Sequence, residues 1–437
     1  MRSDLHLTGS CLRYMSGIRA GEEREKSGEW DACVKVSEVK YSCQQQHVLY
    51  LSGVAMRRVE LLLAIPVVLA GCGHETASQP RVGALVDTID YRTTKGSAIQ
   101  VAEVARYSGM RGELTPIDKL RSMVVMPDGG VAVQDVGTPR IAFFGPNAEP
   151  LGAFGREGGG PGEFRGIFGI GLLGDTVWAG DSRQDRATLI GPDRQLVRVI
   201  SLPKVKGQDN SITALPPIKV LLRLRADDFI GLIPDGEQLF RANLKGEWLN
   251  AMPQAPSGGA RQFQIGNTIA FASLFPSRPQ FDVSADGRLV AMYDNLVEGS
   301  IAPATAVTVL QGTGDTVFVR VIRFEGVDFP KHIADSLIAQ RTQGRPTDYV
   351  QAFRSAVYVP PLYPPVEDVL IGQDDRLWLK LHTDGNQQEY LVLSPGGELV
   401  ETVVFPRRTT VRAAKGPIVW ALQFSEFDVA DIVRYEL

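Results

Sequence analysis

Cysteine is scarce in this chain and is confined to its first part. All four cysteines lie at or before position 72 of the 437 residues. The 365 residues that follow therefore form no disulfide, offer no thiolate nucleophile and have no cysteine ligands for a metal. Burial of an ordinary hydrophobic core has to stabilise that region.

Histidine and an excess of basic charge are lacking as well. Beyond residue 97 the only histidines are His332 and His382, and neither belongs to an HxH or HExxH arrangement. Serine, aspartate and histidine are too scattered to indicate a catalytic triad. Residues 73–437 carry 37 Lys and Arg against 42 Asp and Glu, a net charge of −5. Because phosphate backbones are bound by clustered Lys and Arg, we expect no nucleic-acid partner, and no motif indicates a cofactor.

One short apolar stretch near the start has the layout of a secretory signal. Met56 is followed by two arginines, then by the apolar run Leu61 to Leu69, and then by Ala70, Gly71 and Cys72. A basic start, an apolar stretch and small residues at the cleavage site are the parts of such a signal. The apolar run from Leu61 to Leu69 has nine residues and contains Pro66, whereas a membrane-spanning helix needs roughly 20.

This signal resembles that of bacterial lipoproteins, in which the cysteine at the cleavage site becomes the lipidated first residue. The resemblance implies that Cys72 carries acyl groups and anchors the protein in the cell envelope. Gly73 stands where an inner-membrane retention signal would have aspartate, which implies the outer membrane. We expect translation to start at Met56, so that residues 1–55 are an upstream extension that is not expressed and residues 56–72 are the signal peptide.

The remainder of the chain has the pattern of β-strands. Residues 73–97, polar and poor in large apolar groups, are expected to be a flexible tether, and residues 98–437 the folded domain. Short runs of Val, Ile, Phe and Leu follow turn signals, which is typical of an all-β fold. Six such turns recur at intervals of 41 to 59 residues, with one interval of 88: Asp128-Gly129, Gly174-Asp175, Asp227-Asp228, Asp286-Gly287, Asp374-Asp375 and Lys415-Gly416.

The first two of these units align without gaps at an offset of 46 residues. Val131 matches Val177, Asp135 matches Asp181, and Arg140 matches Arg186. The dipeptide Gly-Pro also recurs, at positions 145 and 191. An internal repeat of this length that is rich in strands is typical of a β-propeller blade.

The chain resembles the NHL-type and related six-bladed β-propeller lipoproteins of bacteria. The residues that carry this resemblance are the stretch GREGGGPGEF from Gly155 to Phe164, the Asp-x4-Arg pairs, and Pro364-Pro365 leading to Asp375-Arg376-Leu377-Trp378. We therefore expect six blades. The last unit offers three strands, so Ala98 to Tyr107 should supply its outer strand and close the ring, which would remove an open sheet edge.

Two further features belong to this expectation. Residues Lys331 to Val357 have apolar residues at helical spacing around a break at Gly344 to Pro346, which predicts a short helical insertion between blades 4 and 5. The tyrosine and proline run from Tyr358 to Pro365 is expected to be extended. Trp178, Trp378 and Trp420 each follow a turn in the second strand of a unit and are expected to fill the core.

The glycine-rich stretch Gly155 to Gly162 is the first candidate for a site. It does not open a helix after a strand, as a dinucleotide fingerprint requires. The resemblance implies that it is the crossover between two blades, where glycine permits positive φ. The charged residues of this loop, Arg156, Glu163 and Arg165, are the candidates for lining one mouth of the central channel and binding a ligand.

Asp135 and Asp181 are the second pair of candidates. Each lies at the end of the second strand of its unit, where it could bind a ligand or a metal near the channel axis. Each could equally cap the following turn by accepting hydrogen bonds from backbone amides, with Arg140 or Arg186 as the ion-pair partner. We favour the cap.

The sequence favours a binding function for a lipid-anchored propeller, with a protein, peptide or glycan as the ligand at the channel mouth. The alternative is a metal-dependent hydrolase or lyase similar to the gluconolactonases. Those propeller enzymes hold calcium with a set of Glu, Asn and Asp, and no match to that set is evident here. We therefore expect no metal site, and the fold by itself does not assign the function.

Overall fold

The computed structural model describes residues 86–94, 98–108, 120–135, 137–203, 205, 220–233, 238–256, 259–275, 280–295 and 303–437. The chain divides into two units, residues 1–77 and 78–437, and every described residue belongs to the second. Cys72, the signal segment and residues 1–55 lie outside the described residues. Neither of the two helices in the described part is long or apolar enough to cross a bilayer.

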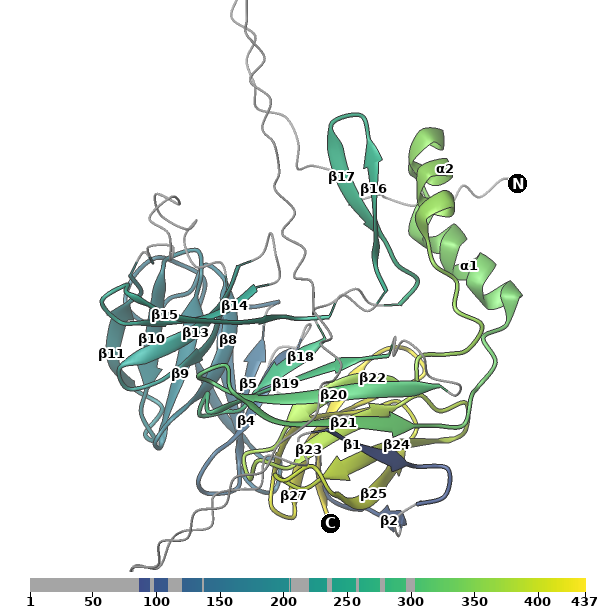
Figure 1. Ribbon diagram of the computed structural model, residues 1–437. Helices are drawn as coiled ribbons and strands as arrows, with labels where there is room; N and C mark the ends of the chain where they lie inside the picture. Colours follow the sequence, from purple (N-terminus) through teal and green to yellow (C-terminus); the bar gives the residue numbers. More distant parts are fainter. Residues whose placement is uncertain are drawn as a thin grey trace, which may run out of the picture. The chain divides into compact units, whose positions relative to one another are not determined.

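The described part is a six-bladed β-propeller (Figure 1). Each blade is an antiparallel meander of four strands, and the first strand of each lines the central cavity. The first three blades consist of β4 (Leu120–Val125), β5 (Val131–Asp135), β6 (Arg140–Phe144) and β7 (Pro150–Phe154); β8 (Ile167–Leu173), β9 (Thr176–Asp181), β10 (Arg186–Ile190) and β11 (Leu196–Ser201); and β12 (Val220–Leu224), β13 (Asp228–Ile233), β14 (Gln238–Asn243) and β15 (Trp248–Gln254).

The other three blades follow the same order. They consist of β18 (Phe281–Val283), β19 (Leu289–Asp294), β20 (Ala304–Gln311) and β21 (Thr316–Arg323); β22 (Val366–Ile371), β23 (Leu377–Leu381), β24 (Gln387–Leu393) and β25 (Leu399–Pro406); and β26 (Thr409–Lys415), β27 (Ile418–Phe424), β28 (Ala430–Glu436) and β3 (Ala102–Tyr107). All six predicted turns join the first strand of a blade to the second, which confirms the blade boundaries.

Burial explains why the middle strands are apolar on both faces. Every residue of β5 and of β6 is buried, whereas the outer strand β11 is largely exposed. A separate hydrophobic cluster fills each of the six interfaces between neighbouring blades. Trp178, Trp378 and Trp420 are fully buried in three of these clusters, as expected. Each blade therefore depends on its neighbours for its core.

The ring closes by pairing both ends of the folded chain. Strand β3 pairs antiparallel with the C-terminal strand β28, with Tyr107 opposite Ile432 and Ala102 opposite Glu436. The predicted closure is confirmed, but Ala98 to Tyr107 is not one strand. Its first part forms β2 (Ala98–Gln100), which pairs parallel with β25 of blade 5.

A second strand lies within the segment expected to be a tether. Strand β1 (Val86–Asp90) pairs parallel with β21 and becomes the fifth strand of blade 4. The prediction of a flexible tether is therefore wrong for residues 86–94. The backbone groups of β21, which would otherwise form an open edge, account for this pairing. Residues 73–85 lie outside the described part.

The insertions between blades 3, 4 and 5 pack together (Figure 1). The hairpin β16 (Arg261–Ile265) and β17 (Thr268–Ala272) precedes blade 4, and helices α1 (Lys331–Thr342) and α2 (Thr347–Ala356) precede blade 5. The predicted helical insertion is confirmed, whereas the hairpin was not predicted. Phe263 of β16 meets Phe353 of α2 edge to face, with ring centroids 6.0 Å apart. The insertions thus form a small core of their own.

Candidate functional site

Asp135 caps the turn after β5. Its Oδ1 accepts hydrogen bonds from the backbone amides of Gly137 at 3.0 Å and Thr138 at 3.3 Å. Its Oδ2 forms an ion pair with Arg140 Nε at 3.1 Å, and the carboxylate is fully buried. In this arrangement the carboxylate serves the turn, as the capping interpretation predicts.

Asp181 caps the corresponding turn after β9, but with other partners. Its Oδ1 accepts from the amide of Arg183 at 3.0 Å, and its Oδ2 accepts from the amide of Arg165 at 2.7 Å and from Gln184 Nε2 at 2.6 Å. Arg186 instead donates to the carbonyl groups of the glycine-rich loop. The predicted Asp181–Arg186 ion pair is therefore wrong, because the loop folds over Arg186 and Oδ2 already has two donors.

The glycine-rich loop is the crossover from β7 to β8. A Cβ atom on Gly155, which has φ +96°, would lie 2.4 Å from the ring of Phe164, so the close approach requires glycine. Glu163 Oε2 accepts from the amide of Gly160 at 2.8 Å, and Oε1 pairs with Arg156. The hydrogen bond from Gly160 and then the Arg156 guanidinium lower the pKa of Glu163.

Four of the five candidate residues lie together, because the crossover loop contacts Asp181 through the amide of Arg165, whereas no hydrogen bond or ion pair between described residues joins Asp135 to them. Asp135 and Asp181 lie under separate turns, while Arg156, Glu163 and Arg165 belong to the crossover loop. The described residues that line the central cavity include none of these five.

The central cavity is narrow, with a volume of about 280 Å³, and all six inner strands line it. Two ion pairs cross between neighbouring inner strands: Arg223 with Asp282 at 3.5 Å, and Arg412 with Asp368 at 3.8 Å. Burial raises the pKa of the Asp282 carboxyl against the opposing effect of Arg223. Asp282 also accepts a hydrogen bond from the amide of Ile371 at 2.8 Å. These groups connect neighbouring blades around the channel.

A larger cavity lies on the upper face, by which we mean the face that carries the connections from one blade to the next. This upper pocket has a volume of about 740 Å³. Its wall is apolar and comes mainly from the run Tyr358 to Pro365, together with Phe275. Its floor is polar and comes from the upper ends of blades 4, 5 and 6, including Asn295, Glu367 and Lys380. The described residues therefore enclose an amphipathic pocket between insertion and propeller.

Glu367 is the centre of the polar floor. Its carboxylate forms an ion pair with Lys380 Nζ at 2.8 Å and a hydrogen bond with His382 Nδ1 at 2.9 Å. Burial by itself would raise the pKa of Glu367, but the contacts with His382 and Lys380 outweigh burial, so the pKa lies below its usual value. The ring of His382 stacks on Tyr363, with centroids 4.0 Å apart and an interplanar angle of 15°.

Backbone contacts hold this floor in place. Tyr293 Oη donates to the carbonyl of Glu367 at 2.8 Å, and Asn295 Nδ2 donates to the carbonyl of Val366 at 2.9 Å. The amide of His382 donates to the carbonyl of Pro365 at 2.9 Å. The predicted extended run Tyr358 to Pro365 thus reaches the ends of β22 and β23, and both sides of the pocket are tied together.

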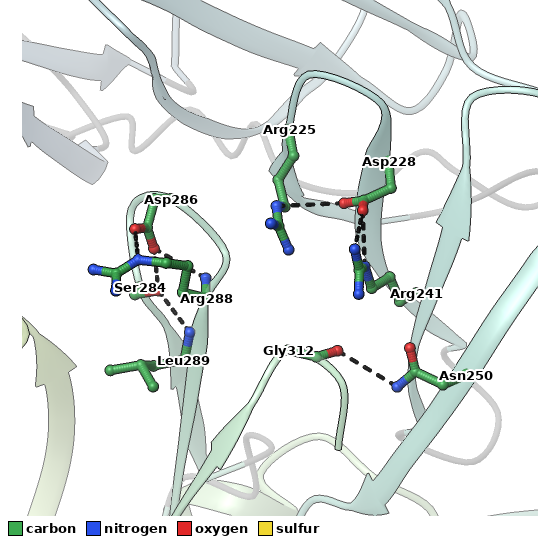
Figure 2. A network of polar contacts seen from close by, with 9 residues as sticks. All are labelled: Arg225, Asp228, Arg241, Asn250, Ser284, Asp286, Arg288, Leu289 and Gly312. Carbon is green, nitrogen blue, oxygen red and sulfur yellow. Dashed lines mark hydrogen bonds and ion pairs between the residues drawn. The ribbon is translucent and has the colours of Figure 1, made fainter. Parts of the chain in front are cut away.

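The opposite, lower face of the propeller carries a polar network between blades 3 and 4 (Figure 2). Asp228 Oδ2 accepts from Arg241 Nε at 2.9 Å, and Arg225 Nε lies 3.5 Å from Oδ1 of the same carboxylate. Asn250 Nδ2 donates to the carbonyl of Gly312 at 3.4 Å, which connects the two blades. The polar groups of the lower face are thus engaged in contacts between turns of the propeller itself. We therefore take the upper pocket as the stronger candidate site.

No sequence signal indicated the upper pocket as a whole. Its lining extends from Gly259 to Arg412, and no short motif contains more than a few of its residues. The run Tyr358 to Pro365 was visible as an extended segment, but not as the wall of a pocket. Among the described residues, no group of three or more His, Cys, Asp or Glu is placed to hold a metal ion.

No protein-family model and no curated protein matches this chain. Among solved structures, the chain is similar to a protein from Bacteroides fragilis named as a putative exported protein, with 11% identity and a TM-score of 0.44, over 81% of this chain and 99% of that one. It is also similar to a DUF4221 family member from Bacteroides vulgatus, with 10% identity and a TM-score of 0.41, over 77% of this chain and 94% of that one. A third similar structure is a catalytically inactive variant of virginiamycin B lyase from Staphylococcus aureus with quinupristin, with 11% identity and a TM-score of 0.32, over 75% of this chain and 82% of that one. Likeness at this level says nothing about function, and the fold assignment rests on the strand pairing described above.

Proposed function

We propose that the protein is a binding module of the bacterial cell envelope whose upper pocket takes part of a protein, peptide or glycan. The observation that carries this proposal is the pocket itself. Its volume of about 740 Å³ falls within the range of roughly 300–1,000 Å³ that is usual for ligand sites. An aromatic and proline wall facing a hydrogen-bonding floor is the composition of such sites, in which apolar area supplies affinity and a few polar groups orient the ligand.

The fixed positions of the polar side chains on the pocket floor support the same proposal. Glu367, Lys380 and His382 are already joined to one another, and Tyr363 covers the histidine ring. A ligand would therefore meet side chains that are already in position, which lowers the entropy lost on binding.

Anchoring of this module rests on the sequence. The basic start at Met56, the apolar run and the small residues before Cys72 support lipidation of Cys72 and attachment to the envelope, with the outer membrane as the expected location. Lipid attachment would keep the binding pocket at the membrane surface.

Filling the pocket tests the proposal. Thr410 lines the upper pocket, whereas Thr313 is exposed in a turn of the lower face. We expect saturation-transfer NMR with a set of capped dipeptides and short oligosaccharides to detect binding to the wild-type protein and to Thr313→Trp, and to lose it in Thr410→Trp. Equal urea midpoints for the two variants would show that both fold. Binding that survives in Thr410→Trp, or no binding to the wild-type protein, would contradict the proposal.

The rival function is a metal-dependent hydrolase or lyase similar to the gluconolactonases. Metal analysis of the purified full chain separates the two. Stoichiometric calcium or zinc that is lost together with activity on a lactone or an ester would overturn the binding module.

A further inference from the structure

A second, smaller cavity adjoins the upper pocket. We call it the cationic pocket; it has a volume of about 300 Å³ and shares Lys380 and Thr410 with the upper pocket. The residues that line it are Lys380, Thr383, Gly385, Gln388, Arg407, Arg408, Thr410 and Phe424. Three of these are basic and none is acidic. On a chain whose net charge is negative, such a local concentration of cations is informative.

The three basic side chains differ in whether a carboxylate forms an ion pair with them. Lys380 pairs with Glu367, and Arg408 pairs with Asp428 and donates to the carbonyl of Ser425. Arg407 is exposed, and within the described part of the chain no carboxylate lies within ion-pair distance of it. The pocket therefore keeps one uncompensated positive charge, and an anion that enters it gains charge-assisted hydrogen bonds.

We infer that the ligand of the upper pocket is the carboxyl-terminal end of an apolar peptide, with its carboxylate in the cationic pocket. This inference rests on the proposed binding role of the upper pocket. Lys380 and Thr410 line both cavities, so the two cavities lie side by side, and the proposed ligand places its apolar part against the wall of one and its carboxylate in the other. Capture of a terminal carboxylate is a recurring mode of peptide recognition.

The floor of the upper pocket favours a peptide over a plain fatty acid. An acyl chain would bury the polar ends of β19 and β22 against methylene groups and leave their hydrogen-bonding groups without compensation, which costs free energy. A peptide instead brings amide groups to the polar side of the pocket and apolar side chains to the wall formed by Tyr358, Leu362 and Tyr363.

The test compares four probes by isothermal titration calorimetry at low salt: N-acetyl-Leu-Phe with a free carboxylate, the same dipeptide as its amide, decanoate, and inorganic phosphate. We expect the wild-type protein to bind the free acid about tenfold more tightly than the amide. Arg407→Gln should abolish that preference while still binding the amide, because Arg407 is exposed and forms no ion pair within the described residues.

Arg198→Gln is the matched control, since Arg198 is also an exposed arginine and lies on the outer strand β11 of blade 2, outside the residues that line either pocket. It should keep the preference for the free acid. A preference that persists in Arg407→Gln, or disappears equally in both variants, overturns the inference. Decanoate binding as tightly as the peptide acid, or phosphate competing as well as the peptide, overturns the peptide assignment. If the acid and the amide bind equally, only this inference fails; if neither binds, the proposed function fails with it.

Discussion

The hydroxyl of Tyr91 lies 3.1 Å from Oγ1 of Thr402, although 311 positions separate the two residues in the chain. Tyr91 is buried and follows strand β1, while Thr402 belongs to β25 of blade 5. The contact therefore joins the strand added to blade 4 to the neighbouring blade. Together with β2 and β3, it makes the N-terminal segment a clasp over three consecutive blades.

The clasp should contribute measurably to stability. Tyr91→Phe removes the buried hydroxyl and leaves Thr402 without this partner, so we expect unfolding to become easier by about 0.5–1.5 kcal/mol. Urea unfolding measures this change. Tyr358→Phe serves as the control, because Tyr358 lies in the pocket wall and makes no hydrogen bond within the described chain; a loss as large in the control would argue against the clasp.

Two of the core tryptophans should respond differently to the same substitution. Trp420 Nε1 donates to the carbonyl of Gly129 at 3.2 Å, whereas among the described residues none accepts from Trp378 Nε1. Both variants to Phe lose similar packing, but only Trp420→Phe also leaves a buried carbonyl without its donor. We expect Trp420→Phe to cost about 1–2 kcal/mol more than Trp378→Phe.

Chemical unfolding of the two variants gives this difference directly. Equal destabilisation would show that the bond to Gly129 contributes nothing, and a larger loss for Trp378→Phe would reverse the prediction.

The ion pair of the pocket floor gives a pH dependence. The pKa of Glu367 is below its usual value of 4.5 in the folded protein, so the unfolded chain binds more protons as the pH falls. The stabilisation from this carboxylate is fully present above about pH 4.5 and is lost as the pH drops through the lowered pKa. The group is partly exposed, so Glu367→Gln should cost at most about 1 kcal/mol at pH 7.

Urea midpoints at pH 7 and pH 3 measure this effect. The urea midpoint of Glu367→Gln should be lower than that of the wild type at pH 7, and the two midpoints should be nearly equal at pH 3. Glu426→Gln, at an exposed carboxylate that forms no ion pair within the described residues, should show no gap at either pH. A gap for Glu367→Gln that widens toward pH 3 would mean that the sign is wrong.

Lipidation is testable on the full chain in a Gram-negative host. We expect the wild-type protein to enter the detergent phase on Triton X-114 partitioning and to have a mass that corresponds to an acylated chain starting at Cys72. Cys72→Ser should remain in the aqueous phase or keep its signal, whereas Cys43→Ser should behave as wild type. Recovery of native protein that still contains residues 1–55 would contradict the expected start at Met56.

The sequence predicted the repeating parts of the fold because the same physics recurs in every blade. A turn such as Asp286-Gly287, followed by a short apolar run, has a local pattern that can be recognised. Strands β1 and β2 have no such pattern. Their residues are mostly exposed, and they form only because the outer strands of blades 4 and 5 offer free backbone groups.

The candidate site was less predictable because it depends on contacts between distant segments. The alignment of Arg140 with Arg186 suggested the same partner in both blades, but Gln184 and the amide of Arg165 occupy the carboxylate of Asp181. In the same way, Glu367 and Lys380 meet only because β22 pairs with β23, with a register shift between Val366 and Asp368. The pocket is lined by side chains from several blades, and these side chains come together only when the ring of blades has formed.

The pairing of β3 with β28 also bears on biosynthesis. Because the partner of this early strand includes Glu436, the last sheet has no outer half until the ribosome has delivered the end of the chain. Ring closure therefore follows the synthesis of β28, and until then the sixth blade lacks the pairing that joins it to β3.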